Sequence, residues 1–183
     1  MQNANISKTY KLIKPEIFAQ ALENIQKADR IFIVGMRSSF SLAYALNHGL
    51  NQVLGNSYLV TNSQGTLDDK VLDITDNDLL IAISFPRYSV YTVELFKTLK
   101  EERNISTIAI TAAGDSPVAK YADILLPCEY NSLGYQNSLS GAAFIIEALV
   151  TSLTLIMPEQ AKKRLTEAET ILKKLKSHTR YNT

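Results

Sequence analysis

Short apolar runs rich in β-branched residues alternate along this chain with segments whose apolar residues recur at helical spacing. The first pattern is typical of buried β-strands and the second of amphipathic helices. The predicted strands cover 31–34, 58–60, 79–83, 107–110 and 124–126. The predicted helices begin at Pro15 and at Pro117 and cover about 38–54, 66–74, 89–103, 138–156 and 159–177. The remaining residues, including the polar segment 131–137, are expected to form loops.

This alternation predicts an α/β fold. Continuous apolar strands separated by helices favour a parallel sheet that is covered on both faces. We therefore expect a three-layer αβα sandwich with a five-stranded parallel sheet in the flavodoxin-like order 2-1-3-4-5. In that order the first and third strands are neighbours at the topological switch point, where ligands bind beyond the carboxyl ends of the strands.

A serine-bearing turn follows each of these two strands. The first reads Gly35-Met36-Arg37-Ser38-Ser39 and the second Ser84-Phe85-Pro86-Arg87-Tyr88-Ser89. Each turn opens a predicted helix, whose free backbone N–H groups and positive end favour an anion. We therefore predict one ligand held from both turns, with a phosphate as its anionic group. The predicted binding residues are Gly35, Arg37, Ser38, Ser39, Ser84, Arg87 and Ser89.

Each of these residues also has a purely structural interpretation. Serines before a helix commonly cap its N-terminus, and Ser84 could satisfy backbone groups at the end of its strand. Arg37 and Arg87 could hold phosphate oxygens bidentately or simply point into solvent. Gly35 would let the backbone turn tightly and approach a ligand.

Size and composition indicate one domain of ordinary globular character. The chain has 183 residues, of which 46% are hydrophobic and 20% charged. We expect a single domain over 1–183, with a helical lead-in over 1–29 and a C-terminal helix and tail over 158–183. The formal net charge of +1 argues against direct, strongly electrostatic binding of nucleic acid.

The sequence gives no sign of a cofactor, a metal site or a membrane anchor. A single cysteine, Cys128, and two histidines exclude a Cys/His zinc cluster and fit a cytoplasmic protein. The N-terminus lacks a signal-peptide pattern. The apolar stretch 139–157 carries a polar stripe that includes Glu147 and Thr151, which favours a buried helix with one polar edge over a membrane span.

At the two turns the chain resembles the SIS (sugar isomerase) fold. Members of that family carry Gly-x-Gly-Ser/Thr-Ser after the first strand and Ser-x-Ser-Gly-x-Thr after the third, and both turns grip a sugar phosphate. Here Arg37 stands in the second glycine position of the first turn, and Pro86 and Arg87 replace the inner serine and glycine of the second. The resemblance extends over about 31–156.

The second turn resembles, more narrowly, the effector domains of RpiR-type transcription regulators, as do Ala28-Asp29-Arg30 and Tyr121-Ala122-Asp123. The resemblance implies a domain that senses a phosphosugar, with DNA bound through a separate N-terminal helix-turn-helix domain. No helix-turn-helix fits before Pro15, so we expect this chain to correspond to the C-terminal half alone.

Three functions remain open from the sequence. The preferred one is a non-enzymatic, phosphosugar-binding regulatory domain, because no catalytic base is evident. The rival is an aldose–ketose isomerase, for which His48, Glu129 and Glu147 are the candidate bases. The third is a dimerisation module whose site has decayed. Self-association into a homodimer or higher homo-oligomer is expected in each case, because the helices over 138–156 and 159–177 carry more apolar surface than one sheet face covers.

Overall fold

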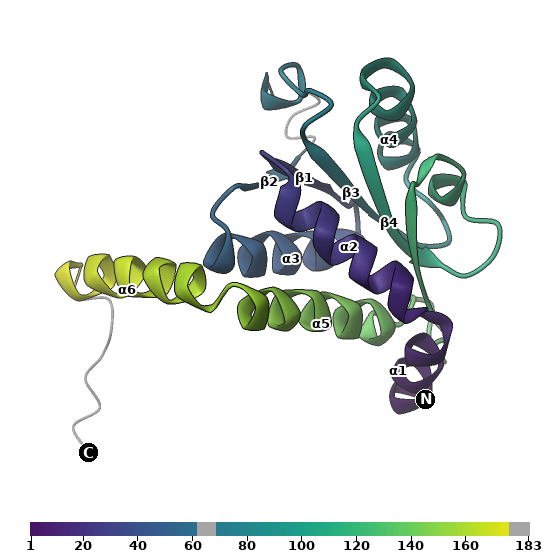
Figure 1. The fold of residues 1–183 in the computed structure, drawn as a ribbon. Helices are drawn as coiled ribbons and strands as arrows, with labels where there is room; N and C mark the ends of the chain where they lie inside the picture. The colour runs from purple at the N-terminus through teal and green to yellow at the C-terminus, as the bar shows by residue number, and fades with distance from the viewer. Residues whose placement is uncertain (62–68, 176–183) are drawn as a thin grey trace.

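Five parallel strands form a single sheet in the order β2-β1-β3-β4-β5, which confirms the predicted topology. The structure is a computed structural model and describes residues 1–61 and 69–175. Figure 1 shows the sheet at the centre of the molecule with helices on both sides. The strands are β1 (Ile31–Val34), β2 (Ser57–Val60), β3 (Leu79–Ser84), β4 (Ser106–Ala112) and β5 (Ile124–Cys128).

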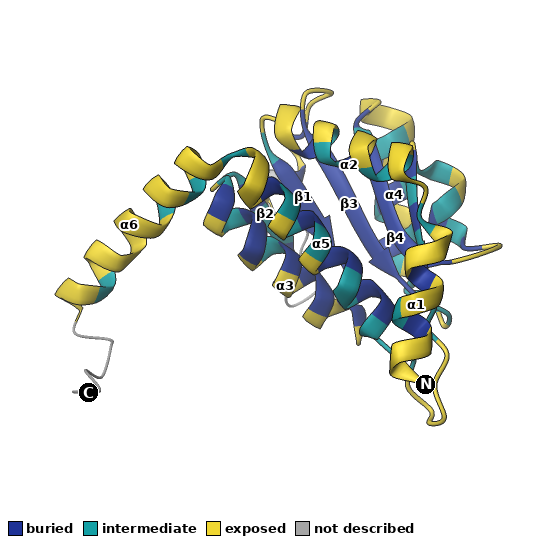
Figure 2. Cartoon of the chain, turned by 60° about the horizontal axis from the view of Figure 1, so that its bottom comes forward, coloured by how far each residue is buried: buried dark blue, intermediate teal, exposed yellow. Residues whose placement is uncertain are grey.

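Helices cover the two faces of the sheet unequally. One face packs against α2 (Pro15–Lys27), α3 (Ser39–Val53) and α5 (Ser140–Ile156). The other packs against α4 (Val90–Arg103), with two short 3-10 helices, η2 (Asp69–Val71) and η3 (Pro117–Tyr121), at its sides. Each face has its own apolar core, and the burial colouring in Figure 2 shows the inner strands β1, β3 and β4 as almost continuously buried.

The central strand β3 shows why this sequence forms a covered parallel sheet. Leu79, Ile81 and Ile83 project into the core beneath α3 and α5, whereas Leu80 and Ala82 project into the core beneath α4. Both sets are buried, so the strand needs apolar residues at every position rather than at alternate ones. Burying a large aliphatic side chain contributes about 1.5–3 kcal/mol, so this strand contributes strongly to the stability of both layers.

The last helix, α6 (Pro158–Lys174), is attached to the domain mainly through its first turns. The guanidinium of Arg164 donates to the carbonyl of Asn51 from Nε and Nη2, at 3.2 and 3.0 Å, and Gln160 donates to the carbonyl of Leu54. These bonds satisfy carbonyls at the C-terminal end of α3, where a positive charge is also favoured. None of the residues of α6 is fully buried, and Figure 2 shows the helix extending away from the rest of the domain.

The helical lead-in expected over 1–29 consists of two helices, α2 and a preceding helix whose bounds the sequence did not give, α1 (Gln2–Leu12). It packs at the end of α5 and beside β5 through the buried polar residues Asn5 and Thr9. Asn5 donates to the carbonyl of Asn131, and the hydroxyl of Thr9 accepts from the backbone N–H of Glu129. Because its buried residues are polar, α1 lacks the apolar periodicity by which a helix is recognised in a sequence.

Two other predicted elements differ from the structure. The start of the helix expected over 66–74 lies outside the described residues, and its described part contains only the 3-10 turn η2, which ends at Val71. The helix expected from Pro117 is also a 3-10 helix, η3. The predicted end of the last helix, near 177, lies beyond the described part of the chain.

Within the described residues no individual helix is both long and apolar enough to span a membrane. Taken together, α5 and α6 reach that length and composition, but the chain bends by 103° between them.

An ion pair fastens the start of β3 at the edge of the sheet opposite the serine turns. Arg30 donates to both carboxylate oxygens of Asp78, at 3.0 and 2.6 Å, and the backbone N–H of Thr75 donates to the same carboxylate at 2.9 Å. Burial by itself would raise the pKa of Asp78, but the hydrogen bonds from Arg30 and Thr75 outweigh it, so the pKa lies below its ordinary value. The carboxylate form therefore stabilises the fold.

Replacing Asp78 with Asn should lower the free energy of unfolding by about 2 kcal/mol at pH 7, because the change removes hydrogen bonds to a buried charged group. The pKa of the native carboxyl is depressed, so its contribution is present at neutral pH and is lost as the pH falls below about 4. Urea unfolding of both proteins at pH 7 and pH 3 measures this. A difference in stability that does not shrink at pH 3 would contradict the assignment.

Candidate functional site

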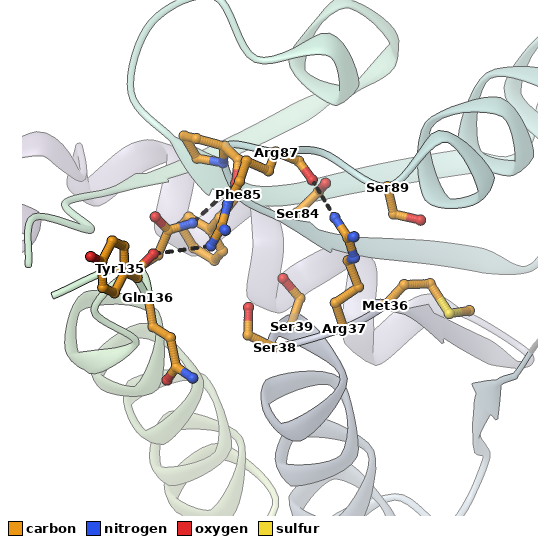
Figure 3. A pocket seen from close by; sticks show the side chains of 12 residues that line it. Met36, Arg37, Ser38, Ser39, Ser84, Phe85, Arg87, Ser89, Tyr135 and Gln136 are labelled. Atoms are coloured by element: carbon orange, nitrogen blue, oxygen red, sulfur yellow. Dashed lines mark hydrogen bonds between the residues drawn. The ribbon is translucent and has the colours of Figure 1, made fainter.

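The turns after β1 and β3 meet at the carboxyl end of the sheet and enclose a pocket, as the sequence predicted. The strands are direct neighbours, with Val34 paired to Ala82, so their turns begin side by side. The pocket has a volume of about 320 Å³ and lies at the start of both α3 and α4. It is lined by Met36, Arg37, Ser38, Ser39, Ser84, Phe85, Pro86, Arg87, Ser89, Tyr135, Gln136 and Asn137 (Figure 3).

The four serines contribute to this pocket in different ways. Ser38 is exposed and sits at the N-cap position of α3, but its side chain makes no capping hydrogen bond, which leaves its hydroxyl able to meet a ligand. Ser39 and Ser84 are buried at the base of the pocket. Ser89 does cap α4, since its hydroxyl accepts from the N–H of Thr92 at 3.5 Å. Its O–H proton remains available for donation to a ligand.

Both arginines of the turns adopt a left-handed backbone conformation. The φ angle is 59° at Arg37 and 66° at Arg87. The only other non-glycine residue with positive φ in the described chain is Asn104, which ends α4. A left-handed residue with a side chain costs about 1–2 kcal/mol relative to glycine. The two arginines thus occupy conformations that glycine adopts with less strain.

Gly35 does not line the pocket, which corrects the expectation that it approaches the ligand. It is buried beneath the first turn of α3, and its φ angle is not positive. A Cβ atom at this position would lie 2.8 Å from the carbonyl oxygen of Ser39 and 3.1 Å from the Cβ of Ala43. Glycine is therefore required here by the close packing of β1 against α3, which places Ser38 and Ser39 at the pocket.

A third segment, the loop between β5 and α5, closes the pocket and was not predicted as part of the site. Arg87 donates to the carbonyl of Tyr135 at 3.1 Å, and Asn137 donates to the carbonyl of Pro86 at 3.1 Å. Arg37 makes a longer contact of 3.4 Å with the carbonyl of Arg87. This loop could have been found from the sequence, because the polar segment 131–137 follows the last strand and therefore begins at the same edge of the sheet as the two serine turns.

Buried hydroxyls support the second turn from below. Thr111 donates to the carbonyl of Ser84, and its hydroxyl also lies 2.7 Å from that of Ser116. Ser116 precedes η3 but makes no capping bond, and its hydroxyl joins this network instead. Burial raises the pKa of the Cys128 thiol, which stays protonated and donates to the carbonyl of Thr111.

The candidate bases of the isomerase hypothesis lie outside the pocket lining. His48 is exposed on α3, where its ring stacks against Tyr44. Glu129 accepts a hydrogen bond from Asn131, and Glu147 is exposed on α5. Among residues 1–61 and 69–175 no group of three or more His, Cys, Asp or Glu side chains is arranged to hold a metal ion.

The sequence profile of the SIS domain family matches residues 24–155, which is more than half of the chain and contains both turns. The chain belongs to the SIS domain family. The solved structure of the sugar isomerase domain of an RpiR transcription factor from Sphaerobacter thermophilus is similar to this SIS domain. The two are 29% identical, the match covers 92% of this chain and 94% of that one, and the TM-score is 0.87.

Two further proteins resemble the SIS domain less closely. The Vibrio vulnificus NanR protein, solved in complex with ManNAc-6P, shares the fold with a TM-score of 0.80 and 20% identity, over 95% of this chain and 66% of that one. An uncharacterised HTH-type transcriptional regulator from Thermotoga maritima is 26% identical over 107 residues, 58% of this chain. The SIS domain spans only 38% of the length of that regulator.

Comparing Arg37→Gly with Arg37→Ala should isolate the backbone strain of the first turn. Both variants lack the guanidinium, but only glycine removes the steric cost of positive φ. We expect Arg37→Gly to be about 1 kcal/mol more stable than Arg37→Ala, measured as the free energy of unfolding in urea. Equal stabilities, or a more stable alanine variant, would show that the turn is not strained in solution.

Proposed function

We propose that this SIS domain binds a sugar phosphate in the pocket between its two serine turns and acts as the effector domain of an RpiR-type transcription regulator. The observation that supports this most directly is the convergence of both turns on one pocket at the switch point of the sheet. The residues that we assign to ligand binding are Arg37, Ser38, Ser39, Ser84, Arg87 and Ser89.

The chemistry of the pocket suits a phosphate ester. Serine hydroxyls donate from both turns, and two helices longer than three turns, α3 and α4, begin at the pocket with their positive ends. The arginines add formal charge and can bind phosphate oxygens bidentately. The polar side chains of Tyr135, Gln136 and Asn137 can bind the hydroxyls of a sugar.

The regulatory part of the proposal is supported by the family and by the relatives. In this proposal DNA is bound by a separate N-terminal domain, and the SIS domain responds to the ligand in the cytoplasm. A ligand can shift such a response only if it binds two conformations with different affinity. The loop contacts of Arg87 and Asn137 provide a route, because the guanidinium that would bind the ligand also holds the carbonyl of Tyr135 in the loop before α5.

We propose binding without catalysis. Aldose–ketose isomerisation moves a proton between adjacent carbons and requires a base within hydrogen-bond reach of the substrate. Within the described part of the chain, the residues lining the pocket include no His, Glu or Asp side chain. A coupled assay for ketose formation tests the rival directly, and turnover that disappears on replacing His48, Glu129 or Glu147 would establish the isomerase instead.

Titration calorimetry with a panel of hexose and pentose phosphates should give saturable binding with one ligand per pocket. Each of the changes Ser84→Ala and Ser89→Ala removes one hydroxyl donor to the phosphate. We expect each to weaken binding about fivefold to tenfold, which corresponds to one hydrogen bond of about 1 kcal/mol.

The matched control is Ser7→Ala, which removes a hydroxyl from the exposed face of α1 outside the pocket. It should bind like the unchanged protein. No saturable binding by any phosphosugar, or equal binding by all four proteins, would contradict the proposed function.

We also propose that the SIS domain self-associates through the end of α5 and the projecting part of α6. Apolar side chains remain exposed along this stretch: Leu155 is 75% exposed, Leu165 58% and Leu175 68%. Apolar side chains exposed together in this way commonly mark an interface between protein molecules.

Replacing Leu165 and Leu175 together with Glu should shift the protein toward monomer, because two charges would enter an apolar interface. Size-exclusion chromatography with light scattering at micromolar concentration measures the change. The matched control replaces Thr166 and Thr170 with Glu on another face of the same helix. An unchanged protein that is already monomeric would refute self-association, and an equal effect of both pairs would refute the assigned interface.

A further inference from the structure

The pocket brings together two arginines and the N-termini of two helices. Two guanidinium groups, from Arg37 and Arg87, lie among the residues that line it. Among the described residues, none that lines the pocket carries a carboxylate that would neutralise them. The start of two helices at the same place adds further positive potential. The whole chain, in contrast, has a formal net charge of only +1.

The two guanidinium groups contact different walls of the pocket. Arg37 contacts the carbonyl of Arg87 in the turn between β3 and α4. Arg87 instead contacts the carbonyl of Tyr135 in the loop before α5. Figure 3 shows the Arg37 side chain directed toward the side of the pocket where Ser84 and Ser89 lie, and the Arg87 side chain directed toward Tyr135 and Gln136.

The serine side of the pocket is sufficient for a phosphate. Ser84, Ser89 and the N-terminal N–H groups of α4 supply neutral donors, and Arg37 supplies a charged one. A phosphate bound there leaves Arg87 on the other wall of the pocket, where it contacts the carbonyl of Tyr135. Each guanidinium uses only part of its donors on a backbone carbonyl, so both retain N–H groups for a ligand.

Arg87 is also held at a structural cost. Its φ angle of 66° would be adopted more easily by glycine. A strained residue beside a binding pocket points to a role for its side chain, since strain of this kind concentrates at functional sites.

We infer that the ligand carries two separate anionic groups: a phosphate ester on the serine side, and a carboxylate or second phosphate that binds Arg87. This inference rests on the proposed function and narrows it from sugar phosphates in general to phosphorylated sugar acids and sugar bisphosphates. A pocket of about 320 Å³ is large enough for a small ligand of this kind.

The experiment uses two pairs of ligands that differ in the second anion. In the first pair, 6-phosphogluconate and glucitol 6-phosphate are both open-chain and carry the same phosphate, but only the first has a carboxylate. The second pair, fructose 1,6-bisphosphate and fructose 6-phosphate, tests a second phosphate. Calorimetry should show that the doubly anionic member of at least one pair binds about tenfold more tightly, and the pair that does so identifies the second anion.

Arg87→Gln, which removes the charge but keeps a side chain of similar length, should reduce this ratio to below about threefold. Arg37→Gln should weaken both members of a pair to a similar extent, so that the ratio is retained. Lys97→Gln removes a positive charge of α4 outside the pocket lining and should leave both affinities unchanged.

The outcomes separate this inference from the proposed function. Equal affinities within both pairs would contradict the inference that the ligand carries a second anion, but they would leave the proposed sugar phosphate site intact. A ratio that survives Arg87→Gln would overturn the assignment of Arg87. No saturable binding by any of the four ligands, nor by the wider panel of phosphosugars, would overturn the proposed function itself.

Discussion

The neighbouring position of β1 and β3 is the constraint on which the rest of the site depends. Parallel strands end at the same edge of the sheet, so the turns after two adjacent strands must begin side by side. Gly35 contributes to the same arrangement, because the absence of a side chain there allows α3 to start close against β1. The first turn of α3 then stands opposite the first turn of α4, and the serines of both segments share one pocket.

The site places charged side chains where the backbone is strained. Glycine would accept the left-handed conformation freely, yet Arg37 and Arg87 occupy these positions. The structure holds them through contacts with carbonyls and through the buried hydroxyl network of Thr111 and Ser116 beneath the second turn. The resulting pocket is more positive and stiffer than one built from glycine and serine alone.

The same arginines connect the pocket to the rest of the domain. Arg37 links the first turn to the second, and Arg87 links the second to the loop that leads into α5. From α5 the chain continues into α6, whose anchor on the end of α3 is the guanidinium of Arg164. The proposed ligand site lies near the start of α5, and the proposed interface includes its end. This helix therefore connects the effector site physically to the interface.

Local chemistry in the sequence was enough to define the layered α/β fold, the strand order and the serine turns. Apolar runs such as 79–83 can be buried only inside a covered sheet, and turn residues after a strand indicate an anion site without reference to distant contacts. Contacts between segments far apart in the chain were decided only by the tertiary structure. They include α1, whose buried Asn5 and Thr9 carry no helical apolar pattern, and the wall formed by Tyr135, Gln136 and Asn137. The left-handed conformations of the two arginines belong with them, because a strained backbone persists only where the surrounding packing imposes it.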